Sequence, residues 1–178
     1  YVLIHGAWHG SWCWDKVSPL LKTKRHEVKA PDLPGHGKDK MSINEVTLDA
    51  YTEKLCKILD AQTEPVVLVG HSMGGIVISQ AAEYRPDKIK TLIYLTAFLL
   101  RNGESMFKIA REDSESLIAP NLILSEDNSY TTIRESAIKE LFYGDCSEQD
   151  VIRAKSLLIP QSTAPMITPI HVTDRNFG

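Results

Sequence analysis

A stretch near the middle of the chain, VVLVGHSMGGIVISQ (66–80), places a serine between two glycines where the residue pattern changes. Apolar, largely β-branched residues precede Ser72, as in a buried strand, and an apolar helical pattern follows it. Gly70 and Gly74 lack Cβ atoms, which lets a strand and a helix approach closely around a strained turn. A hydroxyl raised on such a turn can attack a carbonyl carbon. The pattern therefore favours Ser72 as a nucleophile over a simple glycine turn.

Attack by a serine on a carbonyl carbon creates a negatively charged oxygen, and two backbone N–H groups are candidates to bind it. The Met73 amide lies at the start of the expected helix, where unpaired N–H groups favour negative charge. The Ala7 amide follows a histidine-glycine turn in LIHGAWHGSW, near the start of the chain. We expect His5 to order this turn. A metal site made by His5 and His9 is less favoured, because their loop holds no nearby cysteine or carboxylate.

Other side chains near these residues are candidates for contact with a substrate. Gly6 and His71 are sequence neighbours of the predicted amide and serine, and we predict that both contact substrate. Trp8 is expected to line an apolar pocket, whereas Trp12 and Trp14 are expected to pack in the core, which is the commoner environment of such aromatics.

The loop APDLPGHGKDK resembles two nucleotide-binding patterns without completing either. It lacks the third glycine of a dinucleotide fingerprint and the Gly-Lys-Ser/Thr ending of a phosphate loop. We therefore expect no cofactor and no metal, and we interpret Asp32 and His36 in this loop as structural.

Short apolar strands alternate with helical patterns over the first hundred residues. The expected strands are 1–6, 26–33, 65–70 and 90–100, and the expected helices are 11–23, 47–62 and 74–84. Such alternation implies right-handed crossovers and a mostly parallel sheet with helices on both faces. The predicted fold class is α/β.

The pattern changes after Leu100. Residues 101–170 contain polar loops and short helical stretches, notably 131–142 and 148–158, and no further buried parallel strand. We predict an N-terminal core over 1–100, an inserted helical cap over 101–170, and the start of a return to the core at 171–178.

The overall composition indicates a soluble globular domain without a polyanionic partner. The 178 residues are 43% hydrophobic and 24% charged, with a formal net charge of −3. This balance gives no basic patch for nucleic acid, and no apolar run is long enough to cross a membrane. Three irregularly spaced cysteines fit no disulfide framework, so a reducing, cytoplasmic location is expected. Nothing in the composition argues against a homodimer.

The motifs together resemble those of the α/β-hydrolase superfamily. LIHGAWHGSWCWDKVSPLL, APDLPGHG, VVLVGHSMGG and LTAF are most similar to the group that contains plant methylesterases, hydroxynitrile lyases and bacterial esterases. The resemblance covers residues 1–178. It implies Ser72 as the nucleophile, the Ala7 and Met73 amides as oxyanion donors, and a cap over an apolar pocket. Within that cap, Leu157, Leu158 and Met166 are expected to line the pocket.

The chain departs from this group in one respect. α/β-Hydrolases carry the serine, the acid and the histidine in that order, the last two on loops after later strands. The histidine that follows the serine motif here is His171, which we expect at the surface or pocket rim, and Glu104 is a minor candidate for the acid. We therefore expect the acid and histidine beyond Gly178, the chain to be a fragment, and residues 91–98 to form an exposed sheet edge or pair with strands of another chain or segment.

The function predicted from these residues is that of a serine carboxylic ester hydrolase that needs no cofactor. Its substrates are expected to be small esters with an apolar or aromatic portion, which form an acyl-enzyme at Ser72. One alternative is a non-catalytic protein that retains the pocket for ligand binding. Another is a hydroxynitrile lyase, although the lyases of this group carry a threonine where this chain has Gly6.

Overall fold

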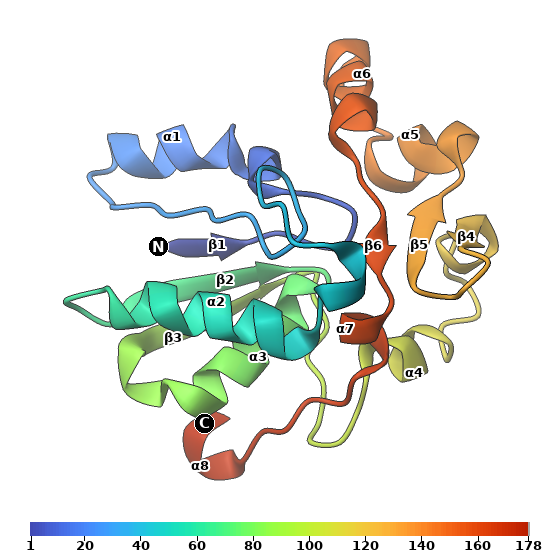
Figure 1. Cartoon of the computed structure of the whole chain (residues 1–178). Helices are drawn as coiled ribbons and strands as arrows, with labels where there is room; N and C mark the ends of the chain where they lie inside the picture. Colours follow the sequence, from blue (N-terminus) through green and yellow to red (C-terminus); the bar gives the residue numbers. More distant parts are fainter. Residues whose placement is uncertain (178) are drawn as a thin grey trace.

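A three-stranded parallel sheet forms the centre of the computed structural model, which describes residues 1–177 (Figure 1). Its strands, in the spatial order β1-β2-β3, are β1 (Val2–Ile4), β2 (Val66–His71) and β3 (Ile89–Leu95). The register pairs Ile4 with Gly70 and His71 with Leu95. The carboxyl ends of all three strands therefore meet at one edge of the sheet.

Helices cover both faces of this sheet, as the alternation of strands and helices predicted. They are α1 (Val17–Thr23), α2 (Leu48–Asp60) and α3 (Gly74–Tyr84). Alternate strand residues point to opposite faces, so Ile4 and Leu68 join the core beneath α2 and α3, while Leu3 and Val69 pack with Trp14 near α1. Figure 1 shows α1 on one side of the sheet and α2 and α3 on the other.

Helix α2 shows why the sequence pattern was informative there. Its buried residues include Leu48, Tyr51, Leu55 and Leu59, which recur at three- and four-residue steps. The Thr47 hydroxyl accepts a hydrogen bond from the Ala50 N–H (3.0 Å) and caps the helix start.

Two expected elements differ from the structure. Residues 26–33 form only an isolated parallel bridge between Lys29 and Val2. Pro31 and Pro34 carry no N–H to donate to a neighbouring strand, which accounts for the failure to extend pairing. The expected helix over 11–23 is divided into a 3-10 helix, Ser11–Trp14, and α1.

The segment after β3 is a mixed α/β cap rather than the helical cap that we predicted. Its elements are α4 (Met106–Ala110), β4 (Leu122–Leu124), β5 (Tyr130–Ile133), α5 (Ile138–Phe142), α6 (Glu148–Leu157), β6 (Gln161–Ser162) and α7 (Ala164–Ile167). Of the helix expected over 131–142, the last part is confirmed as α5, but the first part is strand β5, since Thr131, Thr132 and Ile133 are β-branched and favour a strand. The helix expected over 148–158 is confirmed as α6.

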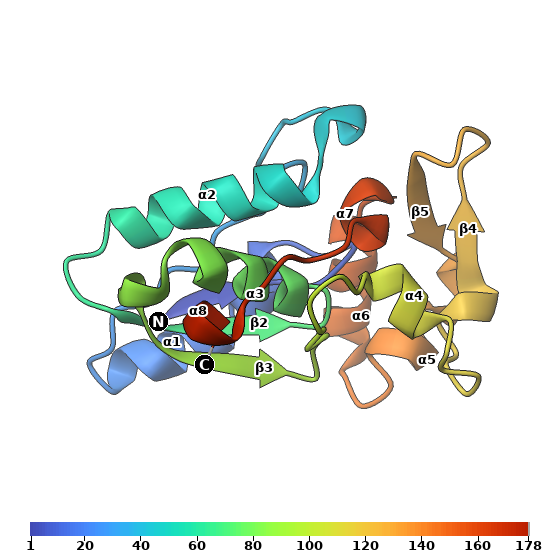
Figure 2. The ribbon, with the colours of Figure 1, turned by 90° about the horizontal axis from the view of Figure 1, so that it is seen from below.

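The cap lies at the carboxyl ends of the core strands. Figure 2 shows β2 and β3 pointing towards α4 and α6, while β4 and β5 lie further out. The described chain also contains four further 3-10 helices, at Ile43–Glu45, Pro86–Lys88, Ala119–Asn121 and Glu135–Ala137. Within residues 1–177, no helix is long and apolar enough to cross a bilayer.

The last described helix, α8 (Asp174–Phe177), returns to the core beside α3. The Glu83 carboxylate on α3 accepts a hydrogen bond from the Thr173 N–H (2.8 Å) just before α8 begins. In the described sheet, β3 is an outer strand that pairs only with β2, as expected for a sheet edge at 91–98.

Candidate active site

Ser72 occupies a strained turn between β2 and α3. Its φ of 52° lies in the left-handed region, which non-glycine residues adopt rarely and at an energetic cost. Residues of β3 and of the loop after it hydrogen-bond to both backbone groups of Ser72. The Ser72 N–H donates to the Leu95 carbonyl (3.3 Å), and the Phe98 N–H donates to the Ser72 carbonyl (3.1 Å). The strain is therefore supported by a second strand.

The two glycines that flank the serine are required by close approach. A Cβ at Gly70 would lie 2.7 Å from the Gly74 carbonyl oxygen, and a Cβ at Gly74 would lie 2.8 Å from the Ile4 carbonyl oxygen. Both contacts are with backbone atoms, which cannot move aside as a flexible side chain can. Strand β2, helix α3 and strand β1 therefore meet at this turn only because both positions lack side chains.

A buried histidine fixes the turn after β1, as expected. The Leu33 N–H donates to His5 Nε2 (3.0 Å), so the ring proton is on Nδ1, which donates to the Gly6 carbonyl (2.9 Å). Burial lowers the His5 pKa to about 3, which keeps the ring neutral. Because the C=O and N–H of a trans peptide point in opposite directions, holding the Gly6 carbonyl also fixes the direction of the Ala7 N–H.

The amides of Ala7 and Met73 have no internal partner. Within residues 1–177, neither N–H donates a hydrogen bond, although both residues are nearly inaccessible, with exposed fractions of 2% and 0%. Buried backbone N–H groups are almost always paired. Two backbone amides near Ser72 are therefore left without a hydrogen-bond acceptor in the described chain.

His9 joins the same loop to the cap. Its Nδ1 donates to the Ala7 carbonyl (2.7 Å), and its Nε2 accepts a hydrogen bond from the Tyr143 hydroxyl (2.6 Å). Burial lowers the His9 pKa to about 4, so the ring is neutral at pH 7. The Trp12 ring stacks on the imidazole with a centroid distance of 5.2 Å. All four ring nitrogens of His5 and His9 are thus used in hydrogen bonds, and the described residues contain no group of three metal-ligating side chains.

Asp32 and His36 make the structural contacts that the sequence suggested. Asp32 accepts hydrogen bonds from the Ser11 N–H (2.6 Å) and the Lys38 N–H (3.0 Å). His36 donates from Nδ1 to the His9 carbonyl (2.6 Å) and accepts from the Tyr51 hydroxyl (2.9 Å). These contacts attach the 32–38 loop to the histidine-glycine loop and to helix α2.

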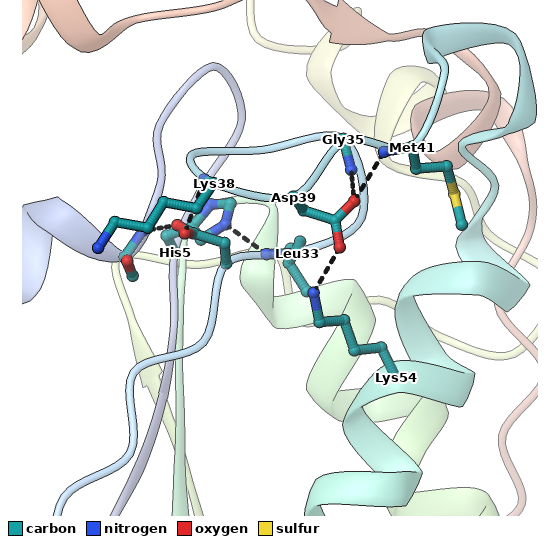
Figure 3. Close-up of polar contacts among 9 residues, drawn as sticks. His5, Leu33, Gly35, Lys38, Asp39, Met41 and Lys54 are labelled. Atoms are coloured by element: carbon teal, nitrogen blue, oxygen red, sulfur yellow. Dashed lines mark hydrogen bonds and ion pairs between the residues drawn. The ribbon is translucent and has the colours of Figure 1, made fainter.

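The same loop is held from its other side by Asp39. Its carboxylate accepts hydrogen bonds from the Gly35 and Met41 N–H groups (both 2.9 Å) and pairs with Lys54 on α2 (2.7 Å; Figure 3). Burial opposes ionisation of Asp39, but the Lys54 and backbone hydrogen bonds outweigh it and lower its pKa to about 2. These contacts fix the 32–38 loop, whose Leu33 N–H in turn hydrogen-bonds to His5 in the turn after β1.

A cavity of about 480 Å³ opens beside Ser72, between the core and the cap. It is lined by Gly6, Ala7, Trp8, His9, Cys13, Trp14, Val17, His71, Ser72, Leu95, Thr96, Ile118, Leu141, Phe142 and Tyr143. We call it the Ser72 cavity. The sequence-predicted Gly6, Ala7, Trp8, His71 and Ser72 are therefore brought together, and Met73 is buried just behind them.

Several residues of the Ser72 cavity were missed by sequence reasoning. Phe142 and Tyr143 reach it from the cap, which no local pattern could reveal, and Trp14 lines it as well as packing in the core. Thr96 comes directly after β3, at the same sheet edge as Ser72, and that placement is a signal that the sequence did offer. The Cys13 thiol also lines the cavity, but burial raises its pKa to about 12, so it is not a thiolate nucleophile at neutral pH.

Comparison with known proteins agrees with this geometry. Residues 1–171 match the family model described as the alpha/beta hydrolase family. The chain belongs to the α/β-hydrolase family.

The relatives of this α/β-hydrolase include proteins named as methylesterases and a pyrethroid hydrolase. It is 33% identical to salicylic acid-binding protein 2 of Nicotiana tabacum over 100% of the chain and 74% of that protein. It is 47% identical to methylesterase 1 of Arabidopsis thaliana over 56% of the chain and 39% of that protein. The crystal structure of a pyrethroid hydrolase superposes with a TM-score of 0.81, 32% identity, 98% coverage of this chain and 72% of the other. The chain spans 43% of the length of another Arabidopsis methylesterase that it matches.

Three cap residues predicted from the family resemblance lie away from the Ser72 cavity. Leu158 lines a separate hollow behind Trp8, and Met166 lines an apolar hollow beside β4 and α7. Leu157 lines none of the described cavities. The prediction placed them by sequence position in the cap, which does not determine which cavity a side chain lines.

The two minor candidates for the triad also lie away from Ser72. The His171 side chain is exposed, and its backbone bonds with the Gln80 side chain on α3. The Glu104 carboxylate accepts a hydrogen bond from the Arg101 N–H (2.8 Å) in a surface turn. In the part of the chain that the structure describes, no imidazole is hydrogen-bonded to the Ser72 hydroxyl.

Proposed function

We propose that this α/β-hydrolase cleaves small carboxylic esters, with Ser72 as the nucleophile. The observation that carries the proposal is the strained Ser72 on the wall of a cavity, with two buried and unpaired backbone amides beside it. Relatives named as methylesterases support the proposal at the level of the reaction. The largely apolar lining, with Trp8, Phe142 and Leu141, supports a substrate with an apolar or aromatic portion.

In the proposed mechanism, the Ser72 oxygen attacks the ester carbonyl carbon and the carbonyl oxygen becomes negative. The amides of Ala7 and Met73 donate hydrogen bonds to that oxygen, which stabilises the transition state more than the neutral ester. The alcohol leaves with a proton, and water then releases the acid from the acyl-enzyme. His5 contributes as a positioning residue, because it fixes the peptide that carries the Ala7 N–H.

One observation favours a second candidate, a ligand-binding protein without catalysis. A serine hydroxyl is a weak nucleophile unless a base lies within hydrogen-bond reach, and no described imidazole occupies that position. The proposal therefore assigns the nucleophile and the oxyanion donors, and it assigns the base to none of residues 1–177.

Covalent labelling separates the two candidates. A fluorophosphonate should label the purified protein at Ser72, as located by peptide mass spectrometry, because only an activated serine reacts. Ser72→Ala should abolish labelling and lower p-nitrophenyl acetate turnover by about 10³-fold or more. Ser156→Ala, at an exposed serine of α6, is the matched control and should retain both. A protein that binds ligands but never labels is a binding protein, and the hydrolase proposal is then wrong.

A third reaction, cyanohydrin cleavage, is tested in the same assay. A Cβ at Gly6 would lie 3.0 Å from the Ser72 Cβ and 3.2 Å from His71 Nδ1, so this position has no room for a hydroxyl-bearing side chain without displacement. We expect negligible cyanide release from mandelonitrile by a preparation that hydrolyses esters. Faster release of cyanide than of p-nitrophenol contradicts the assignment.

A further inference from the structure

Two polar side chains that line the Ser72 cavity make no hydrogen bond within the described chain. His71 ends β2 directly before the serine, and it pairs in register with Leu95 of β3, so Thr96 lies one residue further along the neighbouring strand. Both side chains line the cavity. Among residues 1–177, neither the His71 ring nor the Thr96 hydroxyl makes a hydrogen bond.

Two other polar side chains of the Ser72 cavity, His9 and Tyr143, already pair with each other. His9 uses both ring nitrogens, one on the Ala7 carbonyl and one on the Tyr143 hydroxyl. That contact also engages the Tyr143 hydroxyl. The remaining lining is mostly apolar. Besides Ser72, the side chains left without a hydrogen bond among the described residues are His71, Thr96, the Trp14 indole N–H and the weakly hydrogen-bonding Cys13 thiol. Of these, His71 and Thr96 can both donate and accept a hydrogen bond through nitrogen or oxygen.

The backbone around Thr96 indicates that its position is imposed by the structure. Its φ of 42° is unusual for a β-branched residue. The flanking residues keep it there, because Leu95 accepts from the Ser72 N–H and Phe98 donates to the Ser72 carbonyl. The same contacts that hold the serine turn therefore also hold the Thr96 side chain at the cavity wall.

The chemistry of the pair matches one substituent in particular. Burial lowers the pKa of His71, so its ring is neutral at pH 7 and offers one donor and one acceptor. A threonine hydroxyl can also donate and accept. A substrate hydroxyl, which both donates and accepts a hydrogen bond, is complementary to this pair, whereas a hydrogen or a methyl group forms no hydrogen bond with it.

The reach of the pair sets where that hydroxyl must be. Neighbouring strands lie about 4.8 Å apart, so Thr96 is one strand spacing from the residue that bonds to the carbonyl carbon. Along an acyl chain, the first carbon beyond the carbonyl lies nearest to Ser72 and therefore nearest to Thr96.

We propose that His71 and Thr96 bind a hydroxyl on the carbon next to the scissile carbonyl, so that esters of 2-hydroxy acids are the preferred substrates. The inference rests on the proposed function for the reaction, but the recognition itself requires no catalysis. It is therefore tested by binding, with uncharged amides that the nucleophile does not turn over readily.

The probes are mandelamide and phenylacetamide, which differ by the one hydroxyl. Trp8 and Trp14 line the cavity, so quenching of intrinsic fluorescence reports occupancy. The protein should bind mandelamide roughly three- to tenfold more tightly, the range of one neutral hydrogen bond. Thr96→Val keeps the side-chain shape and should remove the preference, whereas Thr96→Ser should retain it. His71→Phe should also remove it. Thr91→Val, the same change at an exposed position of β3, is the matched control and should keep it.

Equal affinity for the two amides, or no binding of mandelamide, overturns the inference. So does a preference that survives Thr96→Val or His71→Phe. Fluorophosphonate labelling of the same samples separates the two proposals. An unlabelled protein with the mandelamide preference loses the proposed reaction but keeps this recognition site. A labelled protein without the preference keeps the reaction and loses the site. Where ester turnover is measured, methyl mandelate should exceed methyl phenylacetate in kcat/KM by a similar ratio.

Discussion

The two walls of the Ser72 cavity are built in different ways. The core wall, from His5 to His9, is held by buried neutral histidines whose ring nitrogens are all paired. The cap wall, with Leu141 and Phe142, is apolar, and near α6 it is joined to the core by ion pairs that are largely exposed to water. The wall that must direct a backbone N–H is fixed by hydrogen bonds shielded from water. The cap wall is attached near α6 by contacts that are individually weak.

The largest expected difference between the walls is their response to acid. The unfolded chain binds protons at its histidines below about pH 6.5, whereas folding lowers the pKa of His9 to about 4 and that of His5 to about 3. Above pH 6.5 neither state is protonated there, so stability is fully retained. Between pH 6.5 and 4.5 the unfolded state alone gains protons, and the free energy of unfolding should fall by roughly 3 to 5 kcal/mol. Urea titrations at pH 7.0, 5.5 and 4.5 measure this fall, and His9→Gln should reduce it. Equal stability at the three pH values contradicts the prediction.

Removal of the ring that holds the Gly6–Ala7 peptide should have the next largest effect. His5→Leu leaves the Gly6 carbonyl and the Leu33 N–H buried and unpaired, which costs about 2 to 4 kcal/mol of unfolding free energy. If the Ala7 amide binds the oxyanion, kcat should fall about tenfold or more with little change in KM. His5→Gln, whose amide retains a donor, should recover part of kcat. If the mutant loses stability but keeps the wild-type kcat, His5 stabilises the fold without positioning the Ala7 amide, and the positioning role is wrong.

The contact between the two walls should matter less. Tyr143→Phe removes the hydroxyl that donates to His9 Nε2 and leaves that nitrogen without a partner, at a cost of about 1 kcal/mol. The effect on ester hydrolysis should be a rise in KM of a few-fold with kcat nearly unchanged, because the Ala7 carbonyl still accepts from His9 Nδ1. Steady-state kinetics check this, with Tyr84→Phe at an exposed tyrosine of α3 as the control. A selective fall in kcat shows instead that the cap wall positions the reacting atoms.

The smallest effect is expected at the outer attachment of the cap. Lys16 pairs with Asp150 of α6 (2.7 Å), with exposed fractions of 75% and 30% for the two side chains. Lys16→Met, which removes the charge and leaves Asp150 in place, should change the free energy of unfolding by less than about 0.5 kcal/mol. Thermal unfolding of the wild type and of Lys16→Met should show this small stability difference at low salt, and 1 M NaCl should abolish it because salt screens the ion pair. A loss above about 1 kcal/mol places this pair among the contacts that hold the cap.

The sequence predicted the part of the site that local pattern determines. The strand, turn and helix around Ser72 follow from adjacent residues, since Gly70 and Gly74 must be free of Cβ atoms where backbone meets backbone. The role of His5 also followed, because a histidine after a strand has few partners other than its own turn. Residues 26–33 misled, because apolar content suggested a strand while Pro31 and Pro34 limit its pairing.

The cap could not be predicted to the same depth. Strand β5 exists because Leu122–Leu124 and Gln161–Ser162 pair with it from distant parts of the chain, and no local periodicity encodes that pairing. Phe142 and Tyr143 reach the Ser72 cavity for the same reason. Met166 was placed by analogy of position, and only the three-dimensional path of the cap shows that it lines another hollow.

The Ala7 N–H belongs to the main chain, and its direction is set by a ring two residues earlier. Replacing the Ala7 side chain therefore leaves the hydrogen in place, so a conventional alanine scan is blind to this atom. Only a change of the backbone itself, such as an ester in place of the Gly6–Ala7 amide by chemical ligation, would delete the donor while preserving every side chain. Protein engineering of this loop consequently has to work through neighbours such as His5, and a survey of substitutions at position 7 will understate what that residue does.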